Sequence, residues 1–451
     1  MTEYFDNQNI NIHLPVNKAH TISFQTLGCK VNRYESDAVR QAFEDLGFKV
    51  VSDADDADVF IINTCTVTAE ADRKSRQMIR RARRRNPNAV VVAMGCQVEL
   101  LKSASEADIS VGTKNRLSVV DKVLEKIGDS LVHQSEIFTE GAYQEFGSVL
   151  SQEDTRAYIK IEDGCDSFCS YCIIPFARGR VVSRAPDDIL REAADLGNRG
   201  FHEIVLTGIH ICSYGKDRGE GIGALESLLS ALDQIPSIHR IRLGSLEPNS
   251  LTPSFIRSLS DLKKLCPHFH ISLQSGSDSV LARMNRKYDT QVYRSVISQI
   301  RAFFSDAAIT TDVITAFPAE TQKEHEETLR FCCEMRFSRI HVFPFSVRKG
   351  TKAADMSPQV SAQTAAVRRD DLLALSQELS AVFSKSFIGR YVEVLLETRD
   401  EDGTFTGYTK EYVRIHIAAH EGLIQGQVAE VLVQSAADDE LFGGIVQEST
   451  R

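Results

Sequence analysis

Residues 164–180 read GCDSFCSYCIIPFARGR, with Cys165, Cys169 and Cys172 in a C-x3-C-x2-C spacing. Four cysteines saturate a zinc ion or a four-iron cluster, and no second C-x2-C pair lies near this loop. Three thiolates instead predict a 4Fe-4S cluster with one iron left free of protein, an open position of the kind that binds substrate. The alternative is a group of three buried structural cysteines.

The chain around this loop alternates strand-like and helical segments. The strand-like segments are RAYIKIED, EIVLTGIH, IRLGSLEP, HFHISLQSG, ITTDVITAFP and RIHVFPFS. Six βα units over roughly 220 residues predict a parallel α/β barrel, a partial (βα)6 barrel of the TIM type over residues 156–385. Such barrels work at the C-terminal ends of their strands, and four residues stand there beside Cys165: Gly208, Glu247, Gln274 and Ser346.

Residues 1–126 show a second βα pattern. TISFQTLGCK (21–30), DVFIINTC (58–65) and AVVVAMGC (89–96) are strand-like, with amphipathic helical segments between them, which predicts a small parallel sheet flanked by helices. Each strand delivers one cysteine at its C-terminal end: Cys29, Cys65 and Cys96. These ends share one edge of a parallel sheet, so a second cluster site is possible, although three small core residues fit the spacing equally well.

The remaining segments differ in composition. Residues 127–155 are polar with scattered Gly, Ser and Gln, which indicates a linker. Residues 386–451 alternate apolar and polar residues between Gly- and Asp-rich turns, which predicts a small antiparallel β-barrel. This last segment carries 5 basic and 12 acidic residues, an unusual balance for a domain that contacts RNA.

Charge and cysteine usage limit the function classes. A net charge of −10 excludes a bulk electrostatic grip on nucleic acid. Only RKSRQMIRRARRR (73–85), with eight basic residues, is a local patch for RNA, and a solvated helix face is the alternative. No apolar run approaches the ~18 residues of a membrane span, and the chain start lacks a signal-peptide pattern, so we expect a cytoplasmic protein. Six cysteines have predicted ligand roles; Cys212, Cys266, Cys332 and Cys333 are expected to be packed thiols, and His270 and His341 to be core or mouth-lining residues.

GCDSFCSYC resembles the nucleating loop of the radical S-adenosylmethionine (SAM) superfamily. Further segments are similar to the methylthiotransferases within it: TLGCKVNRYES, NTCTVT, MGCQ, LTGIHICSYG, SLEP, SLQSGSDSVLARMNRKY and HVFPFSVRKGT. The resemblance covers nearly the whole chain. It implies an N-terminal methylthiotransferase domain, a radical SAM barrel and a C-terminal TRAM domain of OB-like form. TLGCKVNRYES and GYTKEYVRI most resemble the branch that modifies N6-threonylcarbamoyladenosine in tRNA.

The resemblance also implies cofactors and partners. It assigns one 4Fe-4S cluster to Cys165, Cys169 and Cys172, with SAM on its free iron, and a second 4Fe-4S cluster, for sulfur supply, to Cys29, Cys65 and Cys96. The implied reaction is methylthiolation of adenosine C2 at tRNA position 37, with electrons from a flavodoxin- or ferredoxin-like donor and an unidentified sulfur donor. Five strand-end or loop residues are candidate SAM contacts, with barrel-layer or turn roles as the alternative: Tyr171, Gly208, Glu247, Ser272 and Gln274.

Three alternatives stay open. The enzyme's substrate is then isopentenyladenosine tRNA or an aspartate of a ribosomal protein, or the chain is a non-catalytic RNA-binding protein with structural Fe-S clusters. Arg178, Arg180 and Arg184 are expected either to bind phosphate or substrate carboxylate or to form surface ion pairs.

One stretch departs from the family pattern. DVITAFPAET has Ala316 and Ala319 where the family usually carries glycine. Because a Cβ atom disfavours positive φ, we expect the geometry of this loop to differ.

Overall fold

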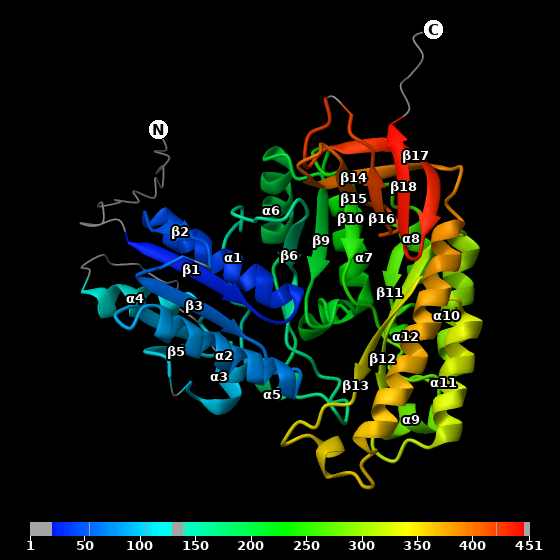
Figure 1. Ribbon diagram of the computed structural model, residues 1–451, viewed down its shortest axis with the longest axis horizontal. Coiled ribbons are helices and arrows are strands. Elements are labelled where there is room, and N and C mark those ends of the chain that lie inside the picture. The colour runs from blue at the N-terminus through cyan, green and yellow to red at the C-terminus, as the bar shows by residue number, and fades with distance from the viewer. Residues whose placement is uncertain are drawn as a thin grey trace, which may run out of the picture.

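The computed structural model describes residues 20–445 except residues 54, 105, 129–138, 140 and 421. Residues 129–138 and 140 of the predicted linker therefore lie outside the described residues, as do the first 19 residues and residues 446–451. The described chain forms three units: an N-terminal unit, a central barrel and a C-terminal barrel (Figure 1). No helix in these described ranges is both long and apolar enough to cross a membrane.

The N-terminal unit is a parallel sheet in the order β2-β1-β3-β4-β5. Its strands are β1 (Thr21–Thr26), β2 (Lys49–Val51), β3 (Val59–Thr64), β4 (Val90–Gly95) and β5 (Ile109–Val111). Helices α1 (Lys30–Asp45) and α4 (Ser118–Ile127) pack on one face, and α2 (Ala69–Arg85) and α3 (Cys96–Leu101) on the other. The predicted parallel sheet is confirmed, with two additional three-residue edge strands, β2 and β5.

The central barrel has six parallel strands. They are β6 (Ala157–Lys160), β9 (Glu203–Thr207), β10 (Arg240–Leu243), β11 (His268–His270), β12 (Ala308–Thr315) and β13 (Arg339–Pro344). They form two three-stranded sheets, joined where Leu246 bridges to Ile271. The predicted partial (βα)6 barrel is confirmed.

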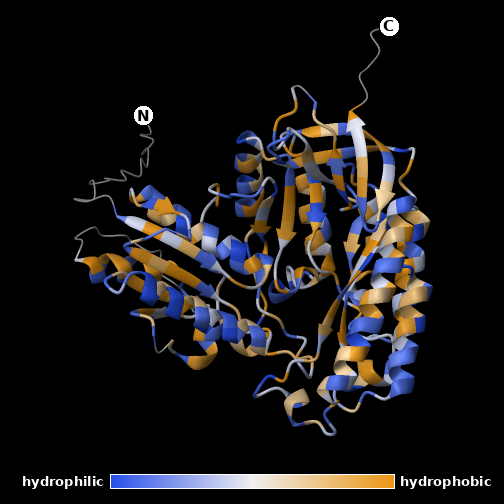
Figure 2. Ribbon diagram, viewed as in Figure 1, coloured by the Kyte–Doolittle hydropathy of each residue, from blue (hydrophilic) through white to orange (hydrophobic). Residues whose placement is uncertain are grey.

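Helices cover the outside of the central barrel, and Figure 2 shows apolar strands inside more polar helices. The covering helices are α6 (Pro186–Asn198), α7 (Ile222–Asp233), α8 (Pro253–Ser260), α10 (Thr290–Phe303), α11 (Gln322–Met335) and α12 (Ala362–Lys385). Short elements at the strand ends are β7 (Glu162–Asp163), α5 (Ile174–Arg178), β8 (Val182–Ser183), α9 (Asp278–Arg283) and the 3-10 turns η1 (Ile211–Ser213), η2 (Lys216–Arg218), η3 (Pro248–Ser250) and η4 (Lys352–Asp355).

The C-terminal barrel closes in the order β14-β15-β16-β18-β17. Its strands are β14 (Tyr391–Arg399), β15 (Phe405–Thr409), β16 (Arg414–Ile417), β17 (Val428–Ala437) and β18 (Glu440–Ile445). The barrel is the one predicted, but it is mixed: β16 and β18 are parallel and the other pairs are antiparallel. A closed ring with an odd number of strands cannot alternate direction throughout, so at least one parallel pair is unavoidable.

The C-terminal barrel sits at the N-terminal ends of the central strands (Figure 1). Arg240 and Arg242 at the start of β10 are fully buried, and both pair with Glu203. Their guanidinium groups also donate to backbone carbonyls of the C-terminal barrel, those of Glu393 and Lys410 among them. The face opposite the cysteine loop is therefore covered by protein.

The cysteine loop of residues 164–180 folds back on itself. The Cys165 N–H donates to the Gly179 carbonyl at 3.1 Å. Gly164 has a φ of +81°, and a Cβ atom there would lie 2.0 Å from the Arg180 carbonyl oxygen. Gly179 has a similar φ of +82° but open space around it.

These two glycines make a matched pair. We expect Gly164→Ala to destabilise the protein by about 3 kcal/mol, because backbone strain and a steric clash add, and to lower the iron content after reconstitution. Gly179→Ala should cost only about 1 kcal/mol, from φ alone. Chemical denaturation and iron analysis of both variants measure the difference, and equal losses would contradict this account of the loop.

Candidate active site

Cys165, Cys169 and Cys172 lie together in the loop between β7 and α5, and all ten cysteines of the chain are free thiols. The Ser167 N–H donates to Cys165 Sγ at 3.4 Å, and Arg286 donates to Cys169 Sγ at 3.0 Å. Burial, together with the neighbouring thiols, raises the pKa of Cys172 to about 12. Three convergent thiols, with donors aimed at two of the sulfurs, fit a metal cluster whose positive charge would ionise them.

Arg286 connects this loop to the strand ends. Besides Cys169, it forms an ion pair with Glu247 after β10. Its Nε donates to the Tyr288 hydroxyl at 3.0 Å, and that hydroxyl donates to the Ser272 carbonyl at 2.6 Å. Glu247 and Ser272, both predicted site residues, thus lie beside the cysteine loop. Arg286 itself was missed by the sequence analysis, although it stands in the quoted segment SLQSGSDSVLARMNRKY.

Gly208 directly follows β9 and lies against a buried carboxyl group. A Cβ atom on Gly208 would lie 2.2 Å from Glu162 Oε1, so the close approach requires glycine. Burial raises the pKa of Glu162 to about 8, and its charge acts in turn on Cys165. Within the described part of the chain, Glu162 Oε2 is buried and has no hydrogen-bond partner. An unpaired carboxyl oxygen therefore lies beside the cysteine loop.

Tyr171 and Gln274 lie at the same end of the barrel. The Tyr171 ring meets Phe317 edge-on at 6.5 Å between centroids. Gln274 is buried with a φ of +69°, and its backbone bridges to β12 through the Asp312 carbonyl and the Ile314 N–H.

The loop that contains Ala316 and Ala319, here called the alanine loop, has a backbone conformation that favours glycine. Ala316 and Ala319 have φ values of +58° and +59°. The Ala316 N–H donates to the Glu320 carboxylate at 2.8 Å, and the Ala319 N–H donates to the Pro358 carbonyl at 2.8 Å. The expectation that alanine removes the positive-φ conformation is therefore wrong, because these hydrogen bonds hold the loop in that conformation despite the added Cβ atoms.

Cys29, Cys65 and Cys96 follow the neighbouring strands β1, β3 and β4. Burial raises the pKa of Cys96 to about 11, and the charge of Cys29 adds to the shift at both Cys96 and Cys65. A Cβ atom on Gly28 would lie 3.0 Å from Cys65 Sγ, so the backbone before Cys29 passes next to the second thiol. Strand order reverses between β1 and β3, the place where open α/β sheets bind ligands.

Arg178 links the two cysteine groups. It ends α5, six residues after Cys172, yet its guanidinium donates to Asn32 Oδ1 at 2.7 Å, in the helix that starts after Cys29. Its charge also opposes the rise in the pKa of Cys65 and Cys96. Arg178 was expected either to bind a ligand or to form a surface ion pair. In the structure it is buried and pairs with Glu35 and Asp163.

The other two arginines differ. Arg184 is buried between Glu145 and Glu192. Arg180 is exposed, 3.8 Å from Asp166, as a surface ion pair would be.

The network around Arg178 is closed to solvent. Glu35 of α1 pairs with Arg116 at 2.9 Å, Lys160 at 2.7 Å and Arg178 at 2.9 Å, and Asp163 shares these three cations. Burial alone would raise the pKa of Glu35, but the three cations outweigh it and lower the pKa to about 2. Charges from both the N-terminal unit and the central barrel thereby fix one geometry.

A cavity of about 570 Å³ lies where the three units meet. We call it the junction cavity. Its wall includes Cys29 and Lys30 of the N-terminal unit, Gly208 of the central barrel, and Tyr412 of the C-terminal barrel. Its volume suits a modified nucleoside, since small-molecule pockets span about 300 to 1,000 Å³. The cavity is therefore shared by the two cysteine-bearing units.

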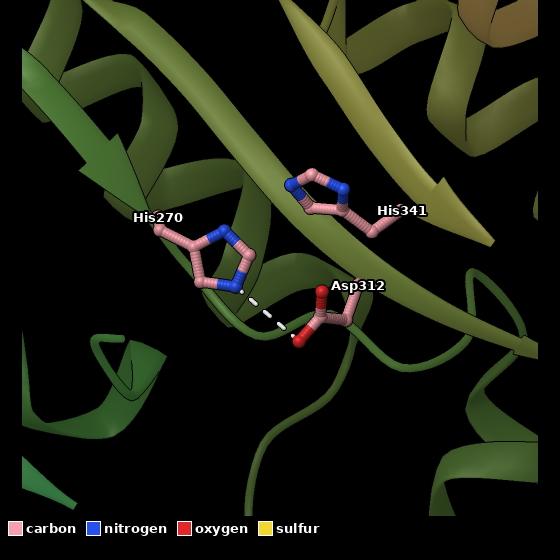
Figure 3. A group of neighbouring side chains, drawn as sticks. All are labelled: His270, Asp312 and His341. Atoms are coloured by element: carbon pink, nitrogen blue, oxygen red, sulfur yellow. Dashed lines mark ion pairs between the residues drawn. The ribbon is translucent and has the colours of Figure 1, made fainter. Parts of the chain in front are cut away.

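His270, Asp312 and His341 project into this cavity from β11, β12 and β13 (Figure 3). His270 Nε2 lies 3.3 Å from the Asp312 carboxylate, and one donor atom from each residue lies within 4.8 Å of the others. Neighbouring ligands of a tetrahedral zinc ion are about 3.3 Å apart, so the group is looser than a preformed zinc site. The mouth-lining alternative predicted for both histidines matches their position.

The basic helix α2 is partly neutralised. Arg73, Arg80 and Arg83 pair with Glu70, Glu106 and Asp108. Arg76, Arg81 and Arg84 have no ion-pair partner within the described ranges.

Comparison with known families and proteins gives concordant results. Residues 159–332 match the radical SAM superfamily, and residues 21–112 match the uncharacterized protein family UPF0004. The threonylcarbamoyladenosine tRNA methylthiotransferase MtaB of Bacillus subtilis is 38% identical, over 92% of this chain and 94% of its own. Its Thermotoga maritima counterpart is 34% identical, over 93% and 95%. The tRNA-2-methylthio-N(6)-dimethylallyladenosine synthase of Acetivibrio thermocellus is 32% identical, over 97% and 94%.

Among solved structures, the radical SAM methyltransferase TsrM from Kitasatospora setae matches with a TM-score of 0.52 and 14% identity. The match covers 75% of this chain and 77% of that one. At this level of identity the likeness concerns the fold alone.

The buried carboxylate of Glu35 makes stability depend on pH. Its folded pKa of about 2 lies below its ordinary value, so its contribution is complete above about pH 5 and disappears as the pH falls toward 2. The shift corresponds to about 3 kcal/mol. We expect Glu35→Gln to flatten the acid limb of the stability curve of the metal-free chain in urea denaturation, whereas Glu125→Gln, on the exposed face of α4, leaves it unchanged. An unchanged acid limb in Glu35→Gln would contradict the ion network.

The alanine loop gives a prediction of opposite sign. Ala316→Gly and Ala319→Gly should each stabilise the protein by about 1 kcal/mol, because glycine relieves a left-handed backbone. Ala365→Gly, within helix α12, should destabilise it by about 1 kcal/mol. Melting temperatures of the three variants test the difference, and a loss in all three would argue against strain at the loop.

Proposed function

The chain belongs to the radical SAM methylthiotransferase family, and on that basis we propose that it methylthiolates C2 of N6-threonylcarbamoyladenosine at tRNA position 37. Two threonylcarbamoyladenosine tRNA methylthiotransferases align along almost the whole chain at 34–38% identity. Membership of the radical SAM superfamily brings a 4Fe-4S cluster and SAM. The observation that carries the proposal is that Arg178 links two separate groups of three cysteines: it follows Cys172 by six residues, and its charge acts on Cys65 and Cys96.

The residues divide into two cluster sites. Cys165, Cys169 and Cys172 hold the cluster that binds SAM, and a second 4Fe-4S cluster is held by Cys29, Cys65 and Cys96. When bound, the cluster at Cys165, Cys169 and Cys172 would supply the electron for reductive cleavage of SAM, and the cluster at Cys29, Cys65 and Cys96 would carry the sulfur to be transferred. Three thiols in each site leave one iron without a protein ligand, which is what both roles require.

The SAM site is built around Glu162 and Arg286. Glu162 Oε2, which has no hydrogen-bond partner in the described structure, would accept a hydrogen bond from the SAM amino group beside Cys165 once the carboxyl group is ionised. Gly208 leaves the space that this carboxyl group occupies, because any side chain would collide with it. Arg286 donates to Cys169 and orients Glu247, while Tyr171, Ser272 and Gln274 form the surrounding wall.

The packing of the N-terminal unit against the central barrel would exclude water and fix the positions of the two cluster sites relative to each other. Arg178 and Glu35 hold the N-terminal unit against the barrel. A fixed contact between the two units that excludes water is what radical chemistry on a substrate would require. We divide the chain accordingly into residues 1–126, a linker at 127–155, the radical SAM domain at 156–385 and the TRAM domain at 386–451. The three folded units and the long helix α12 before residue 386 support these limits.

The proposal also includes a surface for RNA, an electron donor and a cellular compartment. Arg76, Arg81 and Arg84 of α2, which have no ion-pair partner among the described residues, offer phosphate contacts in an otherwise acidic protein. The reductant is a flavodoxin- or ferredoxin-like protein, and the compartment is the cytoplasm, where tRNA is modified and free thiols persist.

Expression of the protein in cells that lack this tRNA modification tests the function. Wild type should restore the methylthio form of threonylcarbamoyladenosine in digested tRNA, as detected by mass spectrometry. Restoration of the methylthio form of isopentenyladenosine, or of a modified ribosomal protein, would assign the substrate to another branch. SAM cleavage by Cys165→Ala equal to that of wild type would support the non-catalytic alternative.

Triple-alanine variants should distinguish the functions of the two cluster sites. Reconstituted wild type should hold about eight irons, and either triple-alanine variant about four. The variant at Cys165, Cys169 and Cys172 should lose SAM cleavage. The variant at Cys29, Cys65 and Cys96 should still release 5′-deoxyadenosine but transfer no methylthio group, whereas Cys333→Ala, at an exposed thiol, should match wild type. Full iron in either triple variant would refute its ligand set.

A further inference from the structure

Lys30 places a cation in the wall of the junction cavity. It is the first residue of α1, directly after Cys29, and its side chain keeps solvent exposure toward the cavity. In the described chain no carboxylate lies within ion-pair distance of its ammonium group. An ammonium group that faces a cavity without a counter-ion is an incomplete site.

The surroundings of Lys30 favour an anion. Arg156 and Arg242 lie close enough for their positive charges to act on it, against the single carboxylate of Glu203. Glu203 is itself taken up by two guanidinium groups, those of Arg240 and Arg242. An anionic ligand group at Lys30 would therefore complete the local charge balance.

The acids of the cavity do not fill this role. Asp312 faces His270, and Asp439 pairs with Arg339. Glu411 also lines the cavity but lies beyond ion-pair distance of Lys30. Of these wall residues, Lys30 is the cation left for a ligand.

We infer that the junction cavity receives the threonylcarbamoyl group of the substrate, with its threonine carboxylate bound by Lys30. This inference rests on the proposed function and adds the determinant of substrate choice. The threonylcarbamoyl group ends in a carboxylate and a hydroxyl group, whereas a dimethylallyl group is an uncharged hydrocarbon. An ammonium group without a carboxylate partner favours the first and rejects the second, because a bound hydrocarbon would cover the charge without neutralising it.

The position of Lys30 also suits the chemistry. Because Lys30 follows Cys29 in the chain, a carboxylate held there anchors the far end of the nucleoside beside the N-terminal cysteine group. His341 lies exposed in the same wall and offers a ring nitrogen to the hydroxyl or carbamoyl group. Lys30 thus acts as a positioning and specificity residue.

Binding measurements on the anaerobic holoenzyme test the inference. The probes are anticodon stem-loop RNAs with N6-threonylcarbamoyladenosine, its methyl ester or unmodified adenosine at the target position. Wild type should bind the acid about 10- to 100-fold more tightly than the ester, as expected for one hydrogen bond between charged groups. Lys30→Met should bind both with the weaker affinity, and Lys30→Arg should recover part of the preference.

The control is Lys49→Met, at an exposed lysine of edge strand β2, which should keep the wild-type preference. An acid-over-ester preference that survives in Lys30→Met would overturn this inference alone. No preference of wild type for the modified over the unmodified RNA would instead overturn the proposed function.

A second measurement on wild type covers the case in which Lys30→Met loses its N-terminal cluster. The acid RNA, but not the ester, should protect Lys30 from reductive methylation, as read by peptide mass spectrometry. Equal modification of Lys30 with either RNA would overturn the inference without any variant.

Discussion

The buried contact of Glu35 with Arg116, Lys160 and Arg178 is the constraint on which the rest of the structure depends. Two cysteine groups made by two different folding units are useful together only if their separation is fixed. Hydrophobic contact alone tolerates small sliding movements, whereas a desolvated ion network is satisfied in one arrangement and is costly in any other. The charge network thus converts two adjoining folds into one site.

The open form of the central barrel follows the same logic. Six strands leave the barrel incomplete, and the N-terminal unit packs beside it (Figure 1). The cavity wall includes residues from all three units. A closed eight-stranded barrel would have no such cavity, because layers of side chains fill its interior. Incompleteness of the barrel is therefore what leaves room for a substrate the size of a modified nucleoside.

Sequence reasoning predicted the fold and the shared sheet edge of the N-terminal cysteines because parallel sheets impose a simple rule. A residue at the end of a buried strand lands at one shared edge, so Cys29, Cys65 and Cys96 were brought together from sequence alone. Short edge strands such as β2 and β5 were missed, since three residues give no periodicity. Gly208, Glu247 and Ser272 also lie at the predicted mouth, but their partners Glu162 and Arg286 depend on distant contacts.

Side-chain roles were less predictable than positions. Arg178 follows a cysteine motif, where a ligand contact is a natural expectation, yet its partners Asn32 and Glu35 are more than 140 residues away in the chain. The conformation of Ala316 and Ala319 differs from the prediction because hydrogen bonds to Glu320 and to the distant Pro358 outweigh the backbone preference of alanine. Lys30 drew attention only as part of a family motif, and the absence of a counter-ion in the described structure is visible only in three dimensions.

The turn between β15 and β16 gives the C-terminal barrel a second task. Tyr412 stacks on Tyr408, meets His268 at the start of β11 and lines the junction cavity, with Arg156 over both tyrosine rings. The C-terminal barrel thus forms one wall of the junction cavity. A chain cut before residue 386 would open that wall to solvent, so a loss of turnover in it would not by itself identify a lost RNA contact.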